Sequence, residues 1–219
     1  MLHVVEAGLQ ADGARTYLAV AGGVEVSLAL GSAATDPTAE LGGIEGRALR
    51  VGDKLAIGPS QVRAERAWPA GVPSCGIVGS ATPATVAIVP GPHLAALPSG
   101  TAAALATSVW TVSARADRVG LRLEGVPLAG ADVLDLVSLP MLPGAVQLPP
   151  NGLPIVLMPD APTVGGYPVP AVIAESDRHL TGQLRPGDSI AFEWIDEREA
   201  RRRSRDRALR LAAVAAELT

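Results

Sequence analysis

Two glycines and a tyrosine in one short segment offer the first chemistry in this sequence. Residues 163–167 read Thr-Val-Gly-Gly-Tyr. Adjacent glycines lack a Cβ and let backbone N–H groups approach an anion closely, and a tyrosine hydroxyl both donates and accepts hydrogen bonds. Thr163, Gly165, Gly166 and Tyr167 are therefore compatible with an anion-facing bend, but a Gly-Gly pair by itself is a weak signal for one. The alternative is a tight turn beside a packed tyrosine.

Arginines close to Asp117 form a second group suited to binding. Arg118 follows Asp117 directly, and Arg122 comes four residues later. A guanidinium binds a carboxylate or phosphate through two parallel hydrogen bonds, which makes Arg118 and Arg122 candidate substrate-binding residues. The alternative is a structural Asp–Arg network that ties strand ends together.

Gln147 and Asp160 are polar residues in apolar surroundings. Each stands in or beside a stretch dominated by aliphatic residues and proline. A buried polar group needs a hydrogen-bonding partner, which is either protein or ligand. Both residues are therefore candidate substrate-facing groups, with a partner inside the protein as the equal alternative.

The remaining reactive side chains have no supporting pattern. His3, His93 and His179 lack the spacing of metal ligands, and Cys75 has no base nearby in the sequence. No glycine-rich segment fits the phosphate-binding pattern GxxxxGK[ST]. We expect no metal on this chain, and any nucleotide must bind in another way.

Composition narrows the class of protein. The 219 residues are 48% hydrophobic and 18% charged, which suits a globular core, and the net charge of −4 argues against a nucleic-acid partner. The uncharged stretches 67–114 and 136–159 contain many prolines, so neither predicts a membrane-spanning helix. The N-terminus lacks the pattern of a signal peptide, and we expect a cytoplasmic protein.

Short strands punctuated by turns must position these side chains. The 24 glycines and 19 prolines favour a mainly β fold, a barrel or sandwich, over long helices. Strands are expected at residues 17–21, 54–57, 85–89, 109–113, 120–123, 145–148, 154–158, 171–174 and 189–195. Short helices are expected at residues 100–107, where Ser99 is the expected N-cap, and 177–184.

Residues 196–218 differ from the rest of the chain. They lack Gly and Pro and carry acid-first i,i+4 pairs with arginine, so they predict one terminal helix. An apolar stripe on this helix would serve for docking: Leu211, Val214, Ala215 and Leu218. Two turns upstream look alike, Arg-Val-Gly-Asp at 50–53 and Arg-Pro-Gly-Asp at 185–188, which hints at two related units.

Three longer segments together carry a family resemblance. They are DRVGLRLEG at 117–125, GAVQLPPNGLPI at 144–155 and TVGGYP at 163–168. The chain resembles the carboxyltransferase-like family that contains the C component of 5-oxoprolinase (KipA) and allophanate hydrolase subunit 2, and whose module also occurs in urea carboxylase. The resemblance implies paired cyclophilin-like β-barrels. Residues 1–195 would be the C-terminal portion of the family module and 196–219 a helical extension.

The resemblance also implies a function. It implies a cytoplasmic complex with the sister B component of the family that uses ATP to open an amide or lactam such as 5-oxoproline. ATP would act in the assembled complex, and biotin is not expected on this chain. In that reaction Thr163, Gly165, Gly166 and Tyr167 would stabilise an oxyanion, while Arg118 and Arg122 would hold an anionic group. The chain alone is expected to be inactive.

Departures from the family pattern leave a second interpretation open. Ala161, Pro162 and Val169 stand where the family pattern has Arg, Gln and Lys, and the family's N-terminal half has no counterpart here. Loss of these polar groups weakens anion binding. The alternative is a catalytically impaired binding or regulatory protein that pairs with the B component. A truncated reading frame or a specificity variant would explain the same departures.

Overall fold

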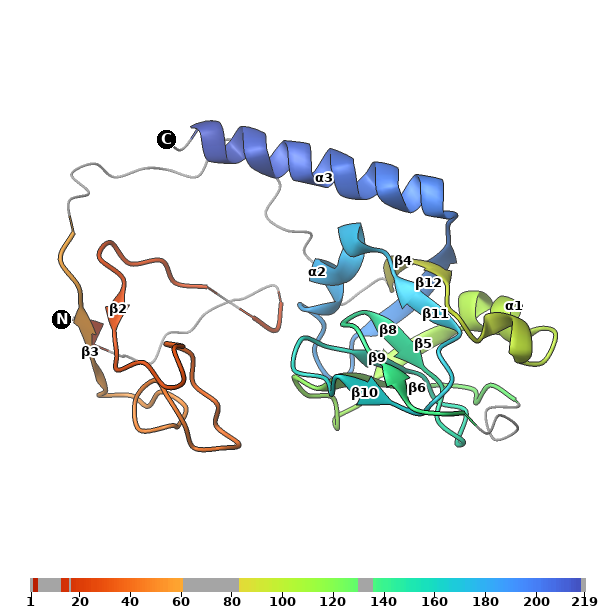
Figure 1. Cartoon of the computed structure of the whole chain (residues 1–219), viewed down its shortest axis with the longest axis horizontal. Coiled ribbons are helices and arrows are strands. Elements are labelled where there is room, and N and C mark those ends of the chain that lie inside the picture. Colours follow the sequence, from red (N-terminus) through yellow and green to blue (C-terminus); the bar gives the residue numbers. More distant parts are fainter. Residues whose placement is uncertain (1, 4–12, 16, 61–82, 130–135, 218–219) are drawn as a thin grey trace. The chain divides into compact units, whose positions relative to one another are not determined.

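The computed structural model describes residues 2–3, 13–15, 17–60, 83–129 and 136–217 (Figure 1). They divide into two compact units. The first comprises the described residues within 1–11 and 16–67, and the second comprises the described residues within 12–15 and 68–219. We call them the sheet unit and the barrel unit and describe each by itself.

Seven described strands close the barrel. In order around the wall they are β11 (Ala171–Ile173), β4 (Ala84–Pro90), β12 (Ser189–Trp194), β5 (Val109–Val112), β6 (Gly120–Glu124), β9 (Ile155–Leu157) and β8 (Ala145–Gln147). Strands β4 and β12 pair in parallel, and the other neighbours pair antiparallel. The predicted β-barrel class is confirmed, and each of these strands overlaps a predicted one.

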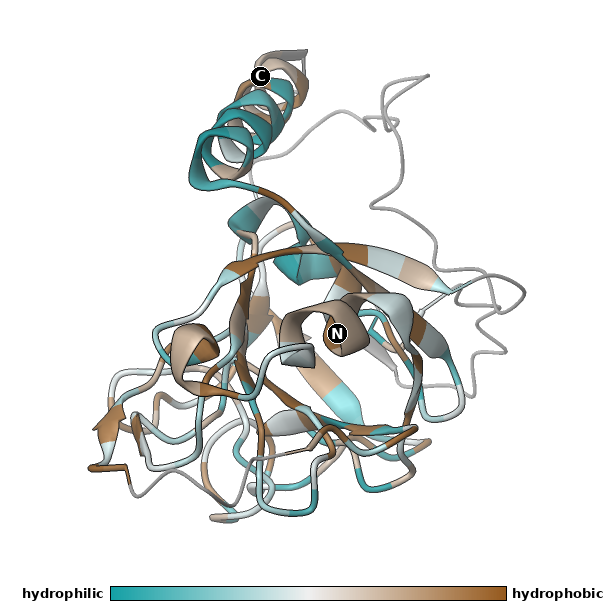
Figure 2. Ribbon diagram, turned by 90° about the vertical axis from the view of Figure 1, so that its right-hand side faces the viewer, coloured by the Kyte–Doolittle hydropathy of each residue, from teal (hydrophilic) through white to brown (hydrophobic). Residues whose placement is uncertain are grey.

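Side chains that point inward fill the barrel. Along β6, Leu121 and Leu123 are buried and Arg122 is exposed, because successive residues of a strand face opposite sides. Trp110 is fully buried in the same core, and its ring N–H donates to the carbonyl of Leu105 at 3.2 Å. Figure 2 shows hydrophobic residues running along the barrel strands.

A second, smaller apolar cluster covers part of the barrel's outer face. Its buried members are Met141, Ala145, Leu157 and Val169. Ala145 and Leu157 alternate with the core residues Val146 and Val156, so they face outward. A two-stranded ribbon contributes to this layer, formed by β7 (Leu139–Pro140) and β10 (Val164–Gly165). The outer layer matters because it forms part of the site described below.

Helical segments lie between and after the barrel strands: η1 (Leu94–Ala96), α1 (Thr101–Thr107), η2 (Glu175–Asp177), α2 (Arg178–Thr181) and α3 (Glu197–Glu217). The prediction that Ser99 caps α1 is wrong. Gly100 is the N-cap, with a φ of 101° and no side-chain cap hydrogen bond. A positive φ favours glycine, so the chain enters α1 through Gly100.

The terminal helix α3 confirms the predicted 196–218 helix (Figure 1). Glu199 accepts hydrogen bonds from Arg202 and Arg203, which lower the pKa of its carboxyl to about 2. Leu211, in the predicted docking stripe, is 53% exposed. Figure 2 shows most of α3 as hydrophilic. None of the helices in the described ranges is long and apolar enough to cross a membrane.

The sheet unit holds a three-stranded antiparallel sheet in the order β1 (Leu2–His3), β3 (Lys54–Ile57) and β2 (Val24–Glu25). The strand predicted at residues 17–21 is wrong. Tyr17 and Leu18 are 89% and 73% exposed, and the strand begins only at Val24, after a turn. An apolar run becomes a strand only where a neighbour pairs with it, and β3 pairs with Val24 and Glu25 instead.

The two similar turns at 50–53 and 185–188 have the same hydrogen bonds. In each, the aspartate carboxylate accepts the arginine backbone N–H at 2.7 Å. The aspartate N–H returns to the arginine carbonyl, at 3.1 Å from Asp53 and at 3.0 Å from Asp188. Gly52 and Gly187 have φ values of 93° and 90°, and each turn leads directly into a strand.

Candidate functional site

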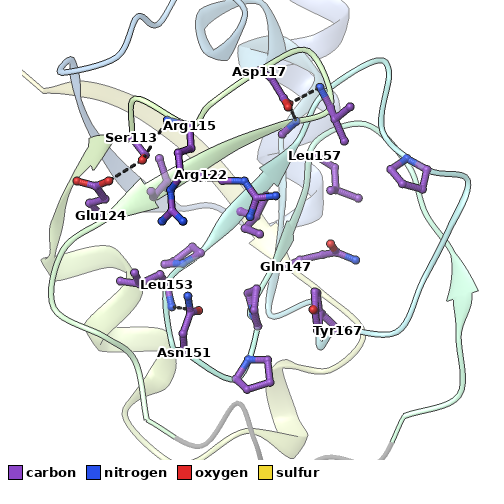
Figure 3. A pocket seen from close by; sticks show the side chains of 18 residues that line it. Ser113, Arg115, Asp117, Arg122, Glu124, Gln147, Asn151, Leu153, Leu157 and Tyr167 are labelled. Carbon is purple, nitrogen blue, oxygen red and sulfur yellow. Dashed lines mark hydrogen bonds between the residues drawn. The ribbon is translucent and has the colours of Figure 1, made fainter. Parts of the chain in front are cut away.

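A cavity of about 520 Å³ lies against the outer face of the barrel wall (Figure 3). Three neighbouring strands, β6, β9 and β8, place residues of the cavity wall side by side across the sheet. Arg122 on β6 and Gln147 on β8 are both opposite Ile155 on β9. Because adjacent strands lie about 4.8 Å apart, Arg122 and Gln147 start roughly 10 Å from each other on the same face. The space between them accommodates a small ligand.

Two short side chains shape the connection between β5 and β6. The Ser113 hydroxyl accepts the N–H of Arg115 at 3.3 Å. The Asp117 carboxylate accepts the N–H groups of Val119 and Gly120, at 2.8 and 2.9 Å. Such local bonds fix the backbone of a turn. They hold Arg115 near the tip of the connection, where it lines the cavity together with Arg122.

The acidic and the basic side chains of the cavity differ in the partners that the protein provides for them. Asp117 is engaged by backbone N–H groups, and Glu124 accepts a hydrogen bond from Ser113. Within the part of the chain that the structure describes, the guanidinium groups of Arg115 and Arg122 form no ion pair. Figure 3 shows both arginines on one side of the cavity, with Gln147 and Tyr167 on the other. The cavity therefore offers cationic donors to a ligand.

Gln147 is a buried polar group of the cavity wall, with 7% of its surface exposed. The one described hydrogen bond of its side chain is weak, from Nε2 to the Met141 sulfur at 3.5 Å. Gly165 on β10 lies against this amide, and a Cβ at that position would come within 2.6 Å of Nε2. Gly165 therefore allows the ribbon to approach Gln147 closely, and the amide retains hydrogen-bonding capacity for a ligand.

Tyr167 reaches the cavity from the segment that follows β10. Its side chain is 46% exposed and lines the cavity beside Pro162. The neighbouring backbone is fixed, since Pro168 accepts the Leu148 N–H at 2.8 Å and His93 Nδ1 accepts the Val169 N–H at 3.0 Å. His93 thus has a structural partner.

The structure brings three of the predicted site residues together: Arg122, Gln147 and Tyr167 all line the cavity. Arg118 and Asp160 instead form an ion pair with each other at 3.1 Å and do not line it. Thr163 directly precedes β10, and its backbone carbonyl accepts the Met141 N–H at 2.8 Å. Gly165 lies behind Gln147, and Gly166 does not line the cavity. The oxyanion role of residues 163–167 stays a prediction.

Arg115 is a cavity residue that the sequence did not predict. It stands within an ordinary loop sequence, Ser-Ala-Arg-Ala. The available signal was the pair of turn-forming residues, Ser113 and Asp117, that bracket it between two predicted strands. Asn151 and Glu124 also line the cavity and were not predicted.

Two of the positions that depart from the family pattern pack into the outer apolar layer, whereas Pro162 lines the cavity. Val169 is 3% exposed, and Ala161 packs against the same cluster.

His179 has a buried Nδ1 without a hydrogen-bond partner, and burial lowers the pKa of its ring. Among the described residues, no group of three or more His, Cys, Asp or Glu side chains gathers in a way that would hold a metal ion.

Sequence comparison identifies the class of protein to which this barrel belongs. Residues 3–194 match the profile of the carboxyltransferase domain, subdomain A and B. The chain belongs to this family.

Similar proteins cover most of this chain. The chain is 38% identical to the C component of 5-oxoprolinase from Escherichia coli over 194 residues, which are 89% of this chain and 60% of that protein. It is 34% identical to the same 5-oxoprolinase component from Haemophilus influenzae, over 84% of this chain and 57% of the relative. The chain therefore spans less than two thirds of the length of both relatives.

A solved structure supports the fold. The urea amidolyase of Kluyveromyces lactis aligns with a TM-score of 0.71 and 24% identity, over 88% of this chain and 13% of that protein. At this identity the likeness bears on the fold alone.

Proposed function

We propose that this chain is part of an ATP-dependent complex that opens an amide or lactam bond, of the 5-oxoprolinase type, and that the outer cavity of the barrel holds the substrate. The observation that carries the proposal is Gln147, a buried amide with spare hydrogen-bonding capacity in a cavity shared with Arg122 and Tyr167. Two relatives above 30% identity are the C components of bacterial 5-oxoprolinases.

The residues of the cavity suit an amide-like substrate. A primary amide both donates and accepts, so Gln147 can pair with a lactam N–H and C=O at once. The Tyr167 hydroxyl donates a hydrogen bond to an oxygen on which negative charge develops. ATP would be used by the assembled complex with the B component, and no biotin attachment to this chain is proposed. The chain alone is expected to be inactive.

The test uses the chain co-expressed with a B component of the same family and measures ATP hydrolysis that depends on 5-oxoproline. Gln147→Ala and Tyr167→Phe are each expected to lower turnover by about tenfold or more, as the loss of one donor to a developing charge typically does. Arg205→Gln, on the exposed face of α3, is the matched control and is expected to keep full turnover. Turnover unaffected by both cavity variants would contradict the proposed site.

A regulatory protein of the same complex is the second candidate function. It is favoured by Ala161 and Val169, which pack into an apolar cluster where the family pattern places charged groups. A complex that assembles with the B component but shows no 5-oxoproline-dependent ATP hydrolysis would support this alternative. Restored turnover in an Ala161→Arg, Pro162→Gln, Val169→Lys triple variant would show that these positions disable the enzyme.

A further inference from the structure

We propose that Arg115 is a specificity-determining residue: together with Arg122 it binds the carboxylate of a substrate, so that the cavity selects a carboxylate-bearing lactam over a neutral amide. This inference rests on the proposed function and names the substrate class of the same site. It departs from the sequence prediction, which paired Arg122 with Arg118.

The first argument is the pairing of charges. Arg118 is bound to Asp160 at 3.1 Å, so it is not the second guanidinium of the cavity. The acids on the cavity wall are engaged by the protein itself, Asp117 by two backbone N–H groups and Glu124 by Ser113. Arg115 and Arg122 face the same cavity without an ion pair in the described ranges. Two guanidinium groups so placed attract an anionic group from solvent.

The second argument is the position of Arg115 on a rigid turn. Its own N–H is bound to the Ser113 hydroxyl, and the Ala116 N–H returns to the Ser113 carbonyl at 3.0 Å. Ser113 is in turn joined to β6 by its N–H, which donates to the Arg122 carbonyl at 2.9 Å. The backbones of the two arginines are therefore fixed relative to each other, and a bound carboxylate does not have to order them.

The third argument is the distance to Gln147. Arg122 on β6 and Gln147 on β8 are separated by one strand, β9, and so start roughly 10 Å apart. Side chains from both sides converge on a ligand of a few heavy atoms. Such a ligand carries an anionic group at one end and an amide at the other, which is the chemistry of a lactam with a carboxylate. A phosphate group of ATP offers the same anionic chemistry, and the experiment separates the two sources.

The experiment measures binding to the chain co-purified with the B component, by titration calorimetry. The probes are 5-oxoproline, 2-pyrrolidinone (the same lactam without its carboxylate) and ATP. Arg115→Gln and Arg122→Gln are each expected to weaken 5-oxoproline binding by at least about tenfold, the cost of a lost charge-assisted hydrogen bond, and to change 2-pyrrolidinone binding less than twofold. Arg205→Gln, exposed on α3, is the control for a lost charge at a distance.

The outcomes separate this inference from the proposed function. Equal effects of Arg115→Gln on 5-oxoproline and 2-pyrrolidinone would overturn the inference and leave the proposed function in place. A weakened affinity for ATP with unchanged 5-oxoproline binding would also overturn it and assign the arginines to the nucleotide. If neither lactam binds the unaltered complex, the proposed function fails and the inference fails with it. Arg115→Lys keeps the positive charge but loses the planar guanidinium that binds a carboxylate through two hydrogen bonds. It is expected to recover part of the affinity that Arg115→Gln loses.

Discussion

The sheet unit and the barrel unit contain the same turn in two different settings. Asp53 and Asp188 each close an Arg-x-Gly-Asp turn with a carboxylate-to-backbone bond of 2.7 Å. Asp188 is 8% exposed, and its turn is bonded to β5 through the Val112 N–H and carbonyl. Asp53 is instead held by the side chain of Arg47, at 2.8 and 3.0 Å. The four residues thus specify the turn itself, whereas the neighbouring strand or side chain determines which further contacts the turn makes.

The two units also differ in what they bury. The barrel unit has a continuous core that includes Trp110, Ile88 and Leu105. In the described part of the sheet unit, the buried hydrophobic residue is Leu55, whereas Leu30 is 96% exposed. Because burial of apolar surface is the main stabilising contribution to a fold, the barrel unit should be the stable part of the molecule. The paired variants at Trp110 and Tyr17, and at Asp188 and Asp53, test this difference.

The largest effect is expected from Trp110→Ala. Removing a fully buried tryptophan leaves a cavity and typically costs about 3–5 kcal/mol of unfolding free energy. Tyr17→Ala, at a site 89% exposed, is expected to change it by less than about 0.5 kcal/mol. Chemical denaturation followed by circular dichroism measures both. Similar losses in the two variants would contradict the assignment of the stable core to the barrel.

Gly165→Ala tests whether the outer layer of the barrel shapes the cavity. A Cβ there would meet Gln147 Nε2 at 2.6 Å, so the amide must move. We expect a cost of about 1–3 kcal/mol from overpacking and a marked loss of 5-oxoproline binding. Gly166→Ala, whose Cβ would meet Ser138 at an ordinary 3.5 Å, is expected to lose less of both. A larger loss from Gly166→Ala would place the critical contact elsewhere.

The sequence could predict elements whose signals are local. The strands of the barrel, the terminal helix and the Arg-x-Gly-Asp turns follow from alternation, helix propensity and turn chemistry within a few residues. Residues 17–21 have the same apolar pattern as a strand, but pairing at Val24 and Glu25 decided the outcome. The capping of α1 turned on the backbone conformation of Gly100, which a propensity for serine at N-caps does not reveal.

The candidate site was predictable in part for the same reason. Arg122, Gln147 and Tyr167 carry polar groups out of strands and loops that the pattern located, and strand register brings them to one cavity. Arg115 lines the cavity and the predicted Arg118 does not. Arg118 instead forms a long-range ion pair with Asp160, which lies far along the chain. No spacing in the sequence specifies that pairing.

Asp188→Ala compares the two turns directly. It removes the acceptor of the Arg185 N–H at the base of β12, and a lost hydrogen bond at a buried site costs about 1–3 kcal/mol. Asp188→Asn keeps an acceptor and is expected to lose less. Asp53→Ala is expected to leave the denaturation midpoint of the barrel unchanged, because the turn it disrupts belongs to the sheet unit. An equal shift of that midpoint by Asp53→Ala and Asp188→Ala would mean that the units unfold together.

The smallest effect is a local response of the sheet unit to acid. Hydrogen bonds from Arg47, then from the Arg50 backbone, lower the pKa of Asp53 from 3.8 to about 2. A lowered pKa means that the bonded turn favours the ionised carboxylate, so the contribution is complete above about pH 4 and is lost as the pH falls through about 2. Amide NMR signals of Arg50 and Asp53, followed from about pH 6 to pH 2, should stay native-like until below about pH 3. In Arg47→Gln the change should move up toward about pH 4, whereas a midpoint near 4 in the unaltered chain would show that Arg47 does not hold this turn in solution.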